Sequence, residues 1–240
     1  MRITYLHHSG FLVELEACCL IFDYFAKGLT RLPDKPVVVF ASHAHHDHYD
    51  PGVFQFVEGR EVTAVLSKDI PKRRWPAGIE VLSVSAHRDY ALPHGIALTT
   101  LQSTDAGVAF YLRTPEGCVY HAGDLNDWHW DDIDLPWNEA QKNGYMASLS
   151  AIAEVVQEDG KIPDAAFVPV DSRLGEFFWM GLDGFMQKVG AEHIFPMHLF
   201  GDKKVIDRMK AHPCAAAYAD RILGTGTEGE VFDITEGETE

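Results

Sequence analysis

Cysteine is scarce in this sequence, and its few positions form no framework. The four cysteines among 240 residues are Cys18, Cys19, Cys118 and Cys214. Two are adjacent and two are isolated, so their spacing matches neither a set of disulfides nor a CxxC metal site. We therefore expect all four to be small, buried apolar side chains.

Positive charge and long apolar runs are also in short supply. The chain has 20 Lys and Arg against 36 Asp and Glu, a formal net charge of −16. A field of that sign repels a nucleic-acid backbone. No apolar run approaches the roughly 20 residues of a membrane-spanning helix, and the first 15 residues lack the apolar core of a signal peptide. We expect a cytoplasmic protein with neither a nucleic-acid nor a membrane partner.

Two short stretches depart from the average charge pattern. The basic run "PKRRW" at residues 71–75 is a single cluster without repeated aromatic platforms, so it predicts a solvated loop rather than a phosphate-binding groove. The tail "EGETE" at residues 236–240 is acidic and polar, and we expect it to fray.

The chain lacks a Pro-, Gly- or Ser-rich linker and any repeat of fixed period, so we expect a single domain over residues 1–240. The apolar pattern predicts helices at 51–57 (with Asp50 as cap and Pro51 in the first position), 138–158, 182–190 and 203–211. It predicts strands at 3–6, 11–15, 19–22, 37–40, 62–66, 79–84, 96–101, 108–113, 118–122, 165–170 and 193–197. Strands that first form a meander and then alternate with helices predict two sheets sandwiched by helices.

Histidines crowd into "FASHAHHDHYD", directly after the apolar strand at 37–40. In extended backbone His43 and His45 share a face, while Asp47 and His48 point opposite ways. The loop can therefore offer His43 and His45 to one metal ion, and Asp47 and His48 to a second one. The alternative is a polar surface loop, but four imidazoles within six residues argue against it. His46 is expected to be merely exposed.

The segment "HAHHDH" resembles the HxHxDH signature of the metallo-β-lactamase superfamily. "ITYLHHSGFLVE" is similar to the opening hairpin of its ascorbate-6-phosphate lactonase-like (UlaG-like) branch, and "LIFDYF" resembles the Asp-bearing second strand. "VYHAGDLND" and "IFPMHLF" resemble the segments that carry a bridging aspartate and a last histidine. The resemblance covers nearly the whole chain and implies a four-layer αββα sandwich.

The same resemblance implies a dinuclear metal centre and assigns several residues to it. Asp124 would bridge the two ions, and His198 would bind the second ion. Asp23 would accept a proton from a ligand imidazole and fix its tautomer, while His8 would lie at the edge of the site. Two divalent ions are expected, with Zn²⁺ first and Mn²⁺ or Fe²⁺ as alternatives.

One family ligand is missing from this sequence. A third histidine of the first metal site is expected in the turn that reads "LQSTDAGVAF" here. Asp105 occupies that turn and could replace the imidazole with a carboxylate oxygen, although an ordinary turn residue is the alternative. His87 and His94 fall too early in the chain. His121, on a strand three residues before Asp124, should face away from the metals.

Two further segments follow strands on the side where the metals are expected. Trp128, His129 and Trp130 could line a pocket beside the metals, or they could be core or rim packing. In "PVDSRLG", Arg173 could hold a substrate anion bidentately, and Asp171 could orient that substrate or move a proton. A local ion pair between Asp171 and Arg173 is the alternative.

These features predict a metal-dependent hydrolase that attacks a small polar ester, lactone or phosphoester with a metal-bridging hydroxide. We expect Asp47, Asp171 and Arg173 to take part in catalysis, and the small-molecule substrate to be anionic. The resemblance also favours a homo-oligomer. A diiron oxidoreductase is one alternative, although such relatives usually carry an acidic residue in place of His45. A noncatalytic metal-binding protein is another, because the third histidine is missing.

Overall fold

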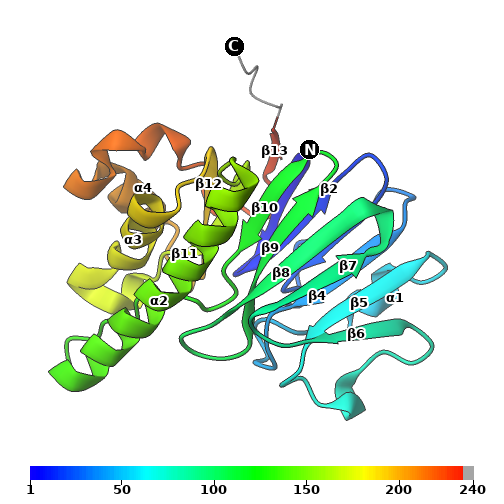
Figure 1. Ribbon diagram of the computed structural model, residues 1–240. Coiled ribbons are helices and arrows are strands. Elements are labelled where there is room, and N and C mark those ends of the chain that lie inside the picture. Colours follow the sequence, from blue (N-terminus) through cyan, green and yellow to red (C-terminus); the bar gives the residue numbers. More distant parts are fainter. Residues whose placement is uncertain (235–240) are drawn as a thin grey trace.

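Two mixed β-sheets lie face to face in the computed structural model, and helices cover their outer faces (Figure 1). The first sheet has the strand order β13-β1-β2-β3-β4-β5-β6, and the second has the order β12-β11-β10-β9-β8-β7. The structure describes residues 1–234, so the acidic tail at 236–240 lies outside the described residues. The predicted four-layer αββα sandwich is confirmed.

The strands of the first sheet are β1 (Arg2–His7), β2 (Gly10–Glu14), β3 (Cys19–Phe22), β4 (Val37–Ala41), β5 (Val62–Ser67), β6 (Glu80–Val84) and β13 (Val231–Asp233). Those of the second sheet are β7 (Arg88–Leu92), β8 (Ile96–Gln102), β9 (Val108–Thr114), β10 (Gly117–His121), β11 (Ala165–Pro169) and β12 (His193–Met197). Strands β3 to β6 run parallel to one another, as do β10 to β12.

Strand β4 shows why the run before the histidines is apolar at every position. Val38 and Phe40 belong to the core between the sheets. Val37 and Val39 belong to a second apolar cluster on the outer face of the first sheet. A parallel strand that is buried on both faces needs a continuous apolar sequence rather than an alternating one.

Aromatic rings fill much of the space between the two sheets. Phe11 of β2 stacks on Phe167 of β11 with ring centroids 4.1 Å apart, and so joins the two sheets. Phe22 and Phe40 stack at 4.7 Å within the first sheet. Fully buried aromatic pairs of this kind add packing energy beyond the area that they bury, and they fix the strand ends that carry the site.

The part of the chain that the structure describes has four α-helices, which complete the outer layers: α1 (Val53–Phe56), α2 (Leu135–Asp159), α3 (Met180–Lys188) and α4 (Lys204–Ala211). Val53 of α1 packs on the outer face of the first sheet. The longest helix, α2, begins where Asp134 accepts a hydrogen bond from the backbone N–H of Trp137, and it ends at Gly160 with a left-handed φ of +69°. In residues 1–234, no helix is both long and apolar enough to cross a bilayer.

Three details differ from the sequence prediction. The helix predicted at 51–57 is a single turn that begins at Val53, because the Asp50 carboxylate accepts the Gly52 N–H at 2.8 Å in the preceding turn. Strands β7 and β13 were not predicted, since β7 reads "RDYAL" and both strands lie at sheet edges, where half of the side chains face water. All four cysteines are free, but only Cys18 and Cys19 are buried.

Candidate metal centre

The loops after β4, β10, β11 and β12 and the turn after β1 gather at one edge of the sandwich. The first of them carries the residues from His43 to His48, and the others carry Asp124, Asp171, His198 and His8. The carboxyl ends of parallel strands usually form the ligand-binding edge of an open sheet. Segments that are far apart in the sequence, from His8 to His198, therefore meet here.

Asp23, directly after β3, holds in place the loop at residues 43–48, which we call the histidine loop. It is fully buried and accepts hydrogen bonds from the Ser42 N–H at 2.7 Å and the Ser42 hydroxyl at 2.6 Å. Its Oδ2 also lies 2.7 Å from Nδ1 of His48. Burial raises the pKa of Asp23, but the bond to His48 and the nearby His121 hold that pKa below its usual value. Asp23 makes the predicted contact and leaves Nε2 of His48 to face the centre.

Two glycines let the neighbouring loops approach Ser42 closely. Gly107 has a φ of +67°, and a Cβ there would collide with the Ser42 carbonyl. Gly123 has a φ of +57°, and its Cβ would lie 2.7 Å from the Cβ of Ser42. Because only glycine fits both the left-handed backbone and the space, these positions bring Asp105 and Asp124 against the histidine loop.

The basic run at 71–75 is exposed at Lys72 and Arg73, as predicted, but it is anchored at Arg74. Arg74 donates hydrogen bonds to the Ala44 carbonyl and, at 2.7 Å, to the Tyr49 carbonyl, and its guanidinium covers the Tyr49 ring. These two carbonyls lie on either side of the segment from His45 to His48. Arg74 therefore clamps the loop, a role that sequence pattern alone did not reveal because its acceptors are backbone atoms of a distant segment.

Asp124 is the centre of the cluster. Its Oδ2 lies 3.3 Å from Nε2 of His43, and its Oδ1 lies 3.2 Å from Nε2 of His48 and 3.5 Å from Nε2 of His198. Burial opposes ionisation of Asp124, but these imidazoles, His48 foremost, hold its pKa well below the usual range. Burial likewise lowers the pKa of His48, yet Asp124 and Asp23 outweigh it and raise that pKa to about 9.

On one side of Asp124 lies the group predicted to hold the first ion. Nε2 of His43 is 3.0 Å from Nδ1 of His45, and Nδ1 of His45 is 3.9 Å from Oδ2 of Asp105. His45, Asp105 and Asp124 can each place a ligand atom within 4.8 Å of the others. Asp105 thus lies where a carboxylate could replace the missing imidazole. His46 is largely exposed, as predicted.

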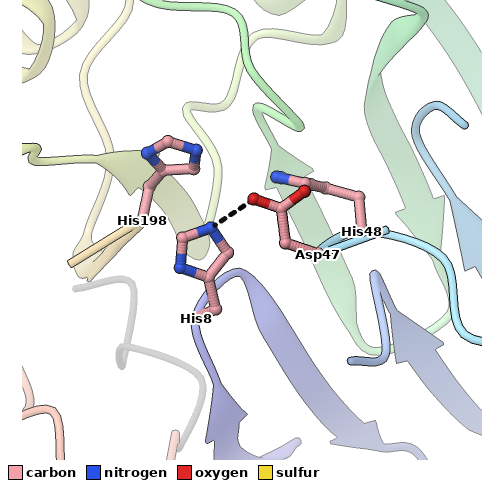
Figure 2. Close-up of side chains that lie close together, drawn as sticks. All are labelled: His8, Asp47, His48 and His198. Carbon is pink, nitrogen blue, oxygen red and sulfur yellow. Dashed lines mark ion pairs between the residues drawn. The ribbon is translucent and has the colours of Figure 1, made fainter. Parts of the chain in front are cut away.

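On the other side of Asp124, four side chains converge from three segments (Figure 2). His8, Asp47, His48 and His198 place one ligand atom each within 4.8 Å of one another. The pKa of Asp47 is also held well below its usual range, since the contacts with His8 and His48 outweigh its burial. We call His8, Asp47, His48 and His198 the second group. It contains the three residues predicted for the second ion, together with His8.

Asp171 and Arg173 lie beside the second group. The buried Asp171 carboxylate lies 3.1 Å from Nδ1 of His198 and accepts hydrogen bonds from Nε and Nη2 of Arg173. Arg173 also covers the ring of Phe200, with its guanidinium carbon 3.4 Å from the ring centroid. The ion pair that the sequence left as an alternative is formed. Bidentate binding of a substrate anion through Nε and Nη2 of Arg173 conflicts with this geometry, because both atoms already donate to Asp171.

His121 is fully buried, and its ring packs among aromatic side chains between the sheets. It was predicted to face away from the metals, and it belongs to none of the candidate ligand groups in residues 1–234. Its Nδ1 accepts the Gly123 N–H at 3.1 Å, and its Nε2 lies 2.9 Å from the Ser9 carbonyl. The ring stacks on Phe22 with an interplanar angle of 8°. His121 therefore ties the Asp124 segment to the turn that carries His8.

Backbone strain is concentrated around the centre. The residues His8, Asp23, His198 and Phe200 have φ values of 55°, 39°, 62° and 46°. Left-handed backbone is unfavourable for residues other than glycine, and such positions tend to cluster at functional sites.

The donor set fits divalent metal ions. Within residues 1–234, three buried atoms at the centre that could coordinate a metal ion make no hydrogen bond, namely Nε2 of His8, Nε2 of His48 and Oδ1 of Asp124. A buried polar atom without a partner costs about 1–3 kcal/mol, and coordination removes that cost. Imidazole and carboxylate ligands suit Zn²⁺, Fe²⁺ and Mn²⁺.

A cavity of about 320 Å³ opens over the centre. Asp47, Asp124 and His198 form part of its floor, and Trp128 and Trp130 form part of its wall. Trp128 also donates its indole N–H to the Asp124 carbonyl at 3.0 Å. The two tryptophans therefore line the pocket, whereas His129, between them in sequence, packs against Phe177.

Comparison with known proteins agrees with this geometry. Residues 2–130, more than half of the chain, match the family described as Beta-lactamase superfamily domain. The protein therefore belongs to the metallo-β-lactamase superfamily. Among its curated relatives is a UPF0173 metal-dependent hydrolase from Desulforamulus reducens, 25% identical over 213 residues that cover 82% of this chain and 84% of the relative.

Two solved structures show that the fold is shared more widely. Igni18, a metallo hydrolase from Ignicoccus hospitalis, superposes with a TM-score of 0.66 at 15% identity and covers 98% of this chain and 99% of its own. CmlA, a diiron β-hydroxylase from Streptomyces venezuelae, has a TM-score of 0.59 at 12% identity over 82% of this chain and 44% of its own. The lactonase-like branch stays a prediction.

Proposed function

We propose that this protein is a metal-dependent hydrolase of a small polar ester, lactone or phosphoester that carries an anionic group. The observation that supports this most is the convergence of imidazoles and carboxylates on the floor of one open cavity of about 320 Å³, which is within the usual size of a small-molecule site. Bound divalent ions supply a hydroxide nucleophile near neutral pH and polarise the oxygen under attack.

Two groups of residues would hold the ions, with Asp124 common to both. His45 and Asp105, with Nε2 of His43 3.0 Å from Nδ1 of His45, would hold the first ion. Asp47, His48 and His198 would hold the second. Zn²⁺ fits this donor set, and Mn²⁺ and Fe²⁺ are also compatible with it. Asp23 and Asp171 would position His48 and His198 through their Nδ1 atoms, as partners of ligand imidazoles commonly do.

The cavity wall would bind the rest of the substrate. The rings of Trp128, Trp130 and Phe200 would cover an apolar part of it and exclude water. Arg173 lines the same cavity, and within residues 1–234 its Nη1 donates to no acceptor. The two N–H groups of Nη1 would bind the anionic group, with Asp171 keeping the guanidinium in place.

A second cavity of about 330 Å³ lies on the other side of Phe200, and Asp47 and Phe200 line both cavities. The attacked bond would therefore have space on two sides. Asp47, at the junction, would orient the attacking water, while the leaving group would occupy the second cavity.

A screen of matched neutral and anionic esters, lactones and phosphoesters with the metal-loaded protein tests this proposal. Asp124→Ala should abolish turnover. Arg173→Ala should raise KM for the best anionic substrate by about tenfold or more, because a hydrogen bond to a charged group contributes about 1.5–3 kcal/mol. Arg173→Lys should lose less. If neutral substrates turn over best, or if both Arg173 variants match the parent, the anion-binding role is wrong.

One observation favours a second candidate, a diiron oxidoreductase. The group formed by His45, Asp105 and Asp124 has two carboxylates and one imidazole, a hard donor set that iron accepts. Metal analysis of the purified protein and oxygen uptake in the presence of a reductant separate the two. Bound iron with oxygen uptake, and no hydrolysis of any substrate in the screen, would replace the hydrolase proposal.

A further inference from the structure

His8 points its imidazole into the second group, within ion-pair distance of Asp47. The residue is 7% exposed, and its Nε2 is buried and makes no hydrogen bond within residues 1–234. That atom lies 3.4 Å from Oδ2 of Asp47. The His8 ring is 4.5 Å from the ring of His198 and 5.6 Å from that of His48, centroid to centroid. Figure 2 shows the His8 ring between Asp47 and His198.

The backbone also holds His8 against His198. Both residues have left-handed φ values, and the His8 carbonyl accepts the backbone N–H of His198 at 3.1 Å. This link between the two turns places the imidazoles of His8 and His198 side by side.

We infer that His8 is a ligand of the second metal ion, together with Asp47, His48 and His198. This inference rests on the proposed metal-dependent function of the same site. An additional imidazole would make the second group the richer one in nitrogen, while the first group would contain a carboxylate in place of its third imidazole. The two sites would therefore differ in the metal that they prefer.

Exposure adds to this difference. The side chains of His45 and Asp105 are 53% and 51% exposed, whereas those of His8 and His198 are 7% and 5% exposed. Buried nitrogen donors bind Zn²⁺ in competition with less water than exposed oxygen donors do. The first equivalent of Zn²⁺ should therefore enter the second site.

A simpler role for His8 is packing, because its ring makes an edge contact with Phe200 at 4.8 Å. Two variants separate packing from coordination. His8→Asn suits the left-handed backbone and removes the imidazole. His7→Asn is the matched control, because Nδ1 of His7 lies 2.8 Å from the Glu228 carboxylate instead of facing the second group.

The experiment measures metal binding without any substrate, so it succeeds or fails independently of the hydrolysis screen. Chelator-stripped parent, His8→Asn and His7→Asn are titrated with Zn²⁺ against a chromophoric chelator. Each is also loaded with one equivalent of Cu²⁺, and pulsed electron paramagnetic resonance counts the coupled imidazoles. Thermal unfolding of each stripped protein reports on packing.

We expect His8→Asn to bind the first equivalent of Zn²⁺ at least about tenfold more weakly and to show one imidazole fewer than the parent. His7→Asn should match the parent in both measurements. If His8→Asn keeps the parent's affinity and imidazole count, His8 is a packing residue and the inference is wrong. If stripped His8→Asn is unstable, His8→Gln is judged by the same two measurements.

Discussion

Replacing Asp23 by asparagine would test how the centre is held. The φ of Asp23 is +39°, and asparagine tolerates left-handed backbone at least as well as aspartate does. The two side chains have nearly the same shape. The substitution therefore changes hydrogen bonding and charge beneath His48 without changing the packing or the backbone.

The size of the effect follows from the three donors that Asp23 faces. The Ser42 N–H, the Ser42 hydroxyl and Nδ1 of His48 all lie within 2.7 Å of its carboxylate oxygens. Asparagine has one acceptor oxygen, so at least one of these donors would face an NH₂ group. A buried donor without a partner costs about 1–3 kcal/mol, and the free energy of unfolding should fall by that amount. Loss of the carboxylate beneath a ligand imidazole should also weaken Zn²⁺ binding about 10–100-fold.

Denaturant unfolding of the stripped protein and Zn²⁺ titration measure the two effects separately. Asp164→Asn is the matched control, since Asp164 accepts the Cys118 N–H at 2.8 Å at the opposite end of β11 from Asp171. It should lose stability and keep the parent's Zn²⁺ affinity. The reasoning is refuted if Asp23→Asn loses stability but binds Zn²⁺ as tightly as the parent.

Three further predictions concern the surroundings of the centre. Arg74→Ala should lower the unfolding free energy by about 1–3 kcal/mol and weaken Zn²⁺ binding in titration, whereas the exposed Arg73→Ala should change neither. Gly123→Ala should destabilise more than Gly59→Ala in denaturant unfolding, because both have positive φ but only Gly123 lacks space for a Cβ. Burial holds the pKa of Tyr145 well above 10, so the folded state keeps a proton that the unfolded chain loses. The contribution of Tyr145 to the free energy of unfolding is thus full below about pH 10 and is lost above it. Tyr145→Phe should therefore reduce the fall in unfolding free energy measured between about pH 8 and about pH 11.

Much of the candidate site could be predicted because its strongest signal is local. His43 to His48 lie within one loop after an apolar strand, and short-range geometry suffices to place them together. Asp124 and His198 follow other strands, so the resemblance was needed to bring them to the same edge. The sheet order later placed both beside His48.

Other contacts could not be predicted because they depend on the packing of distant segments. Arg74 binds backbone carbonyls, which any sequence offers, so nothing in its surroundings marked it as a clamp. His8 follows the first strand, and only the assembled sandwich shows that its Nε2 faces Asp47. The pairing of Nε and Nη2 of Arg173 with Asp171 depends on side-chain conformations that spacing does not determine.

The left-handed residues around the centre also bear on how quickly metal is captured. His8 and His198 are linked by a backbone hydrogen bond, and Asp23 fixes the histidine loop through Ser42. The turns that carry His8 and His198 and the loop that carries His43 to His48 are therefore held in place by the protein itself, in contrast to small domains that fold only around their metal. Capture should proceed in one kinetic phase whose rate is set by how readily the ion sheds its water. An ion that exchanges water slowly should then be captured slowly, even where the ligands prefer it at equilibrium.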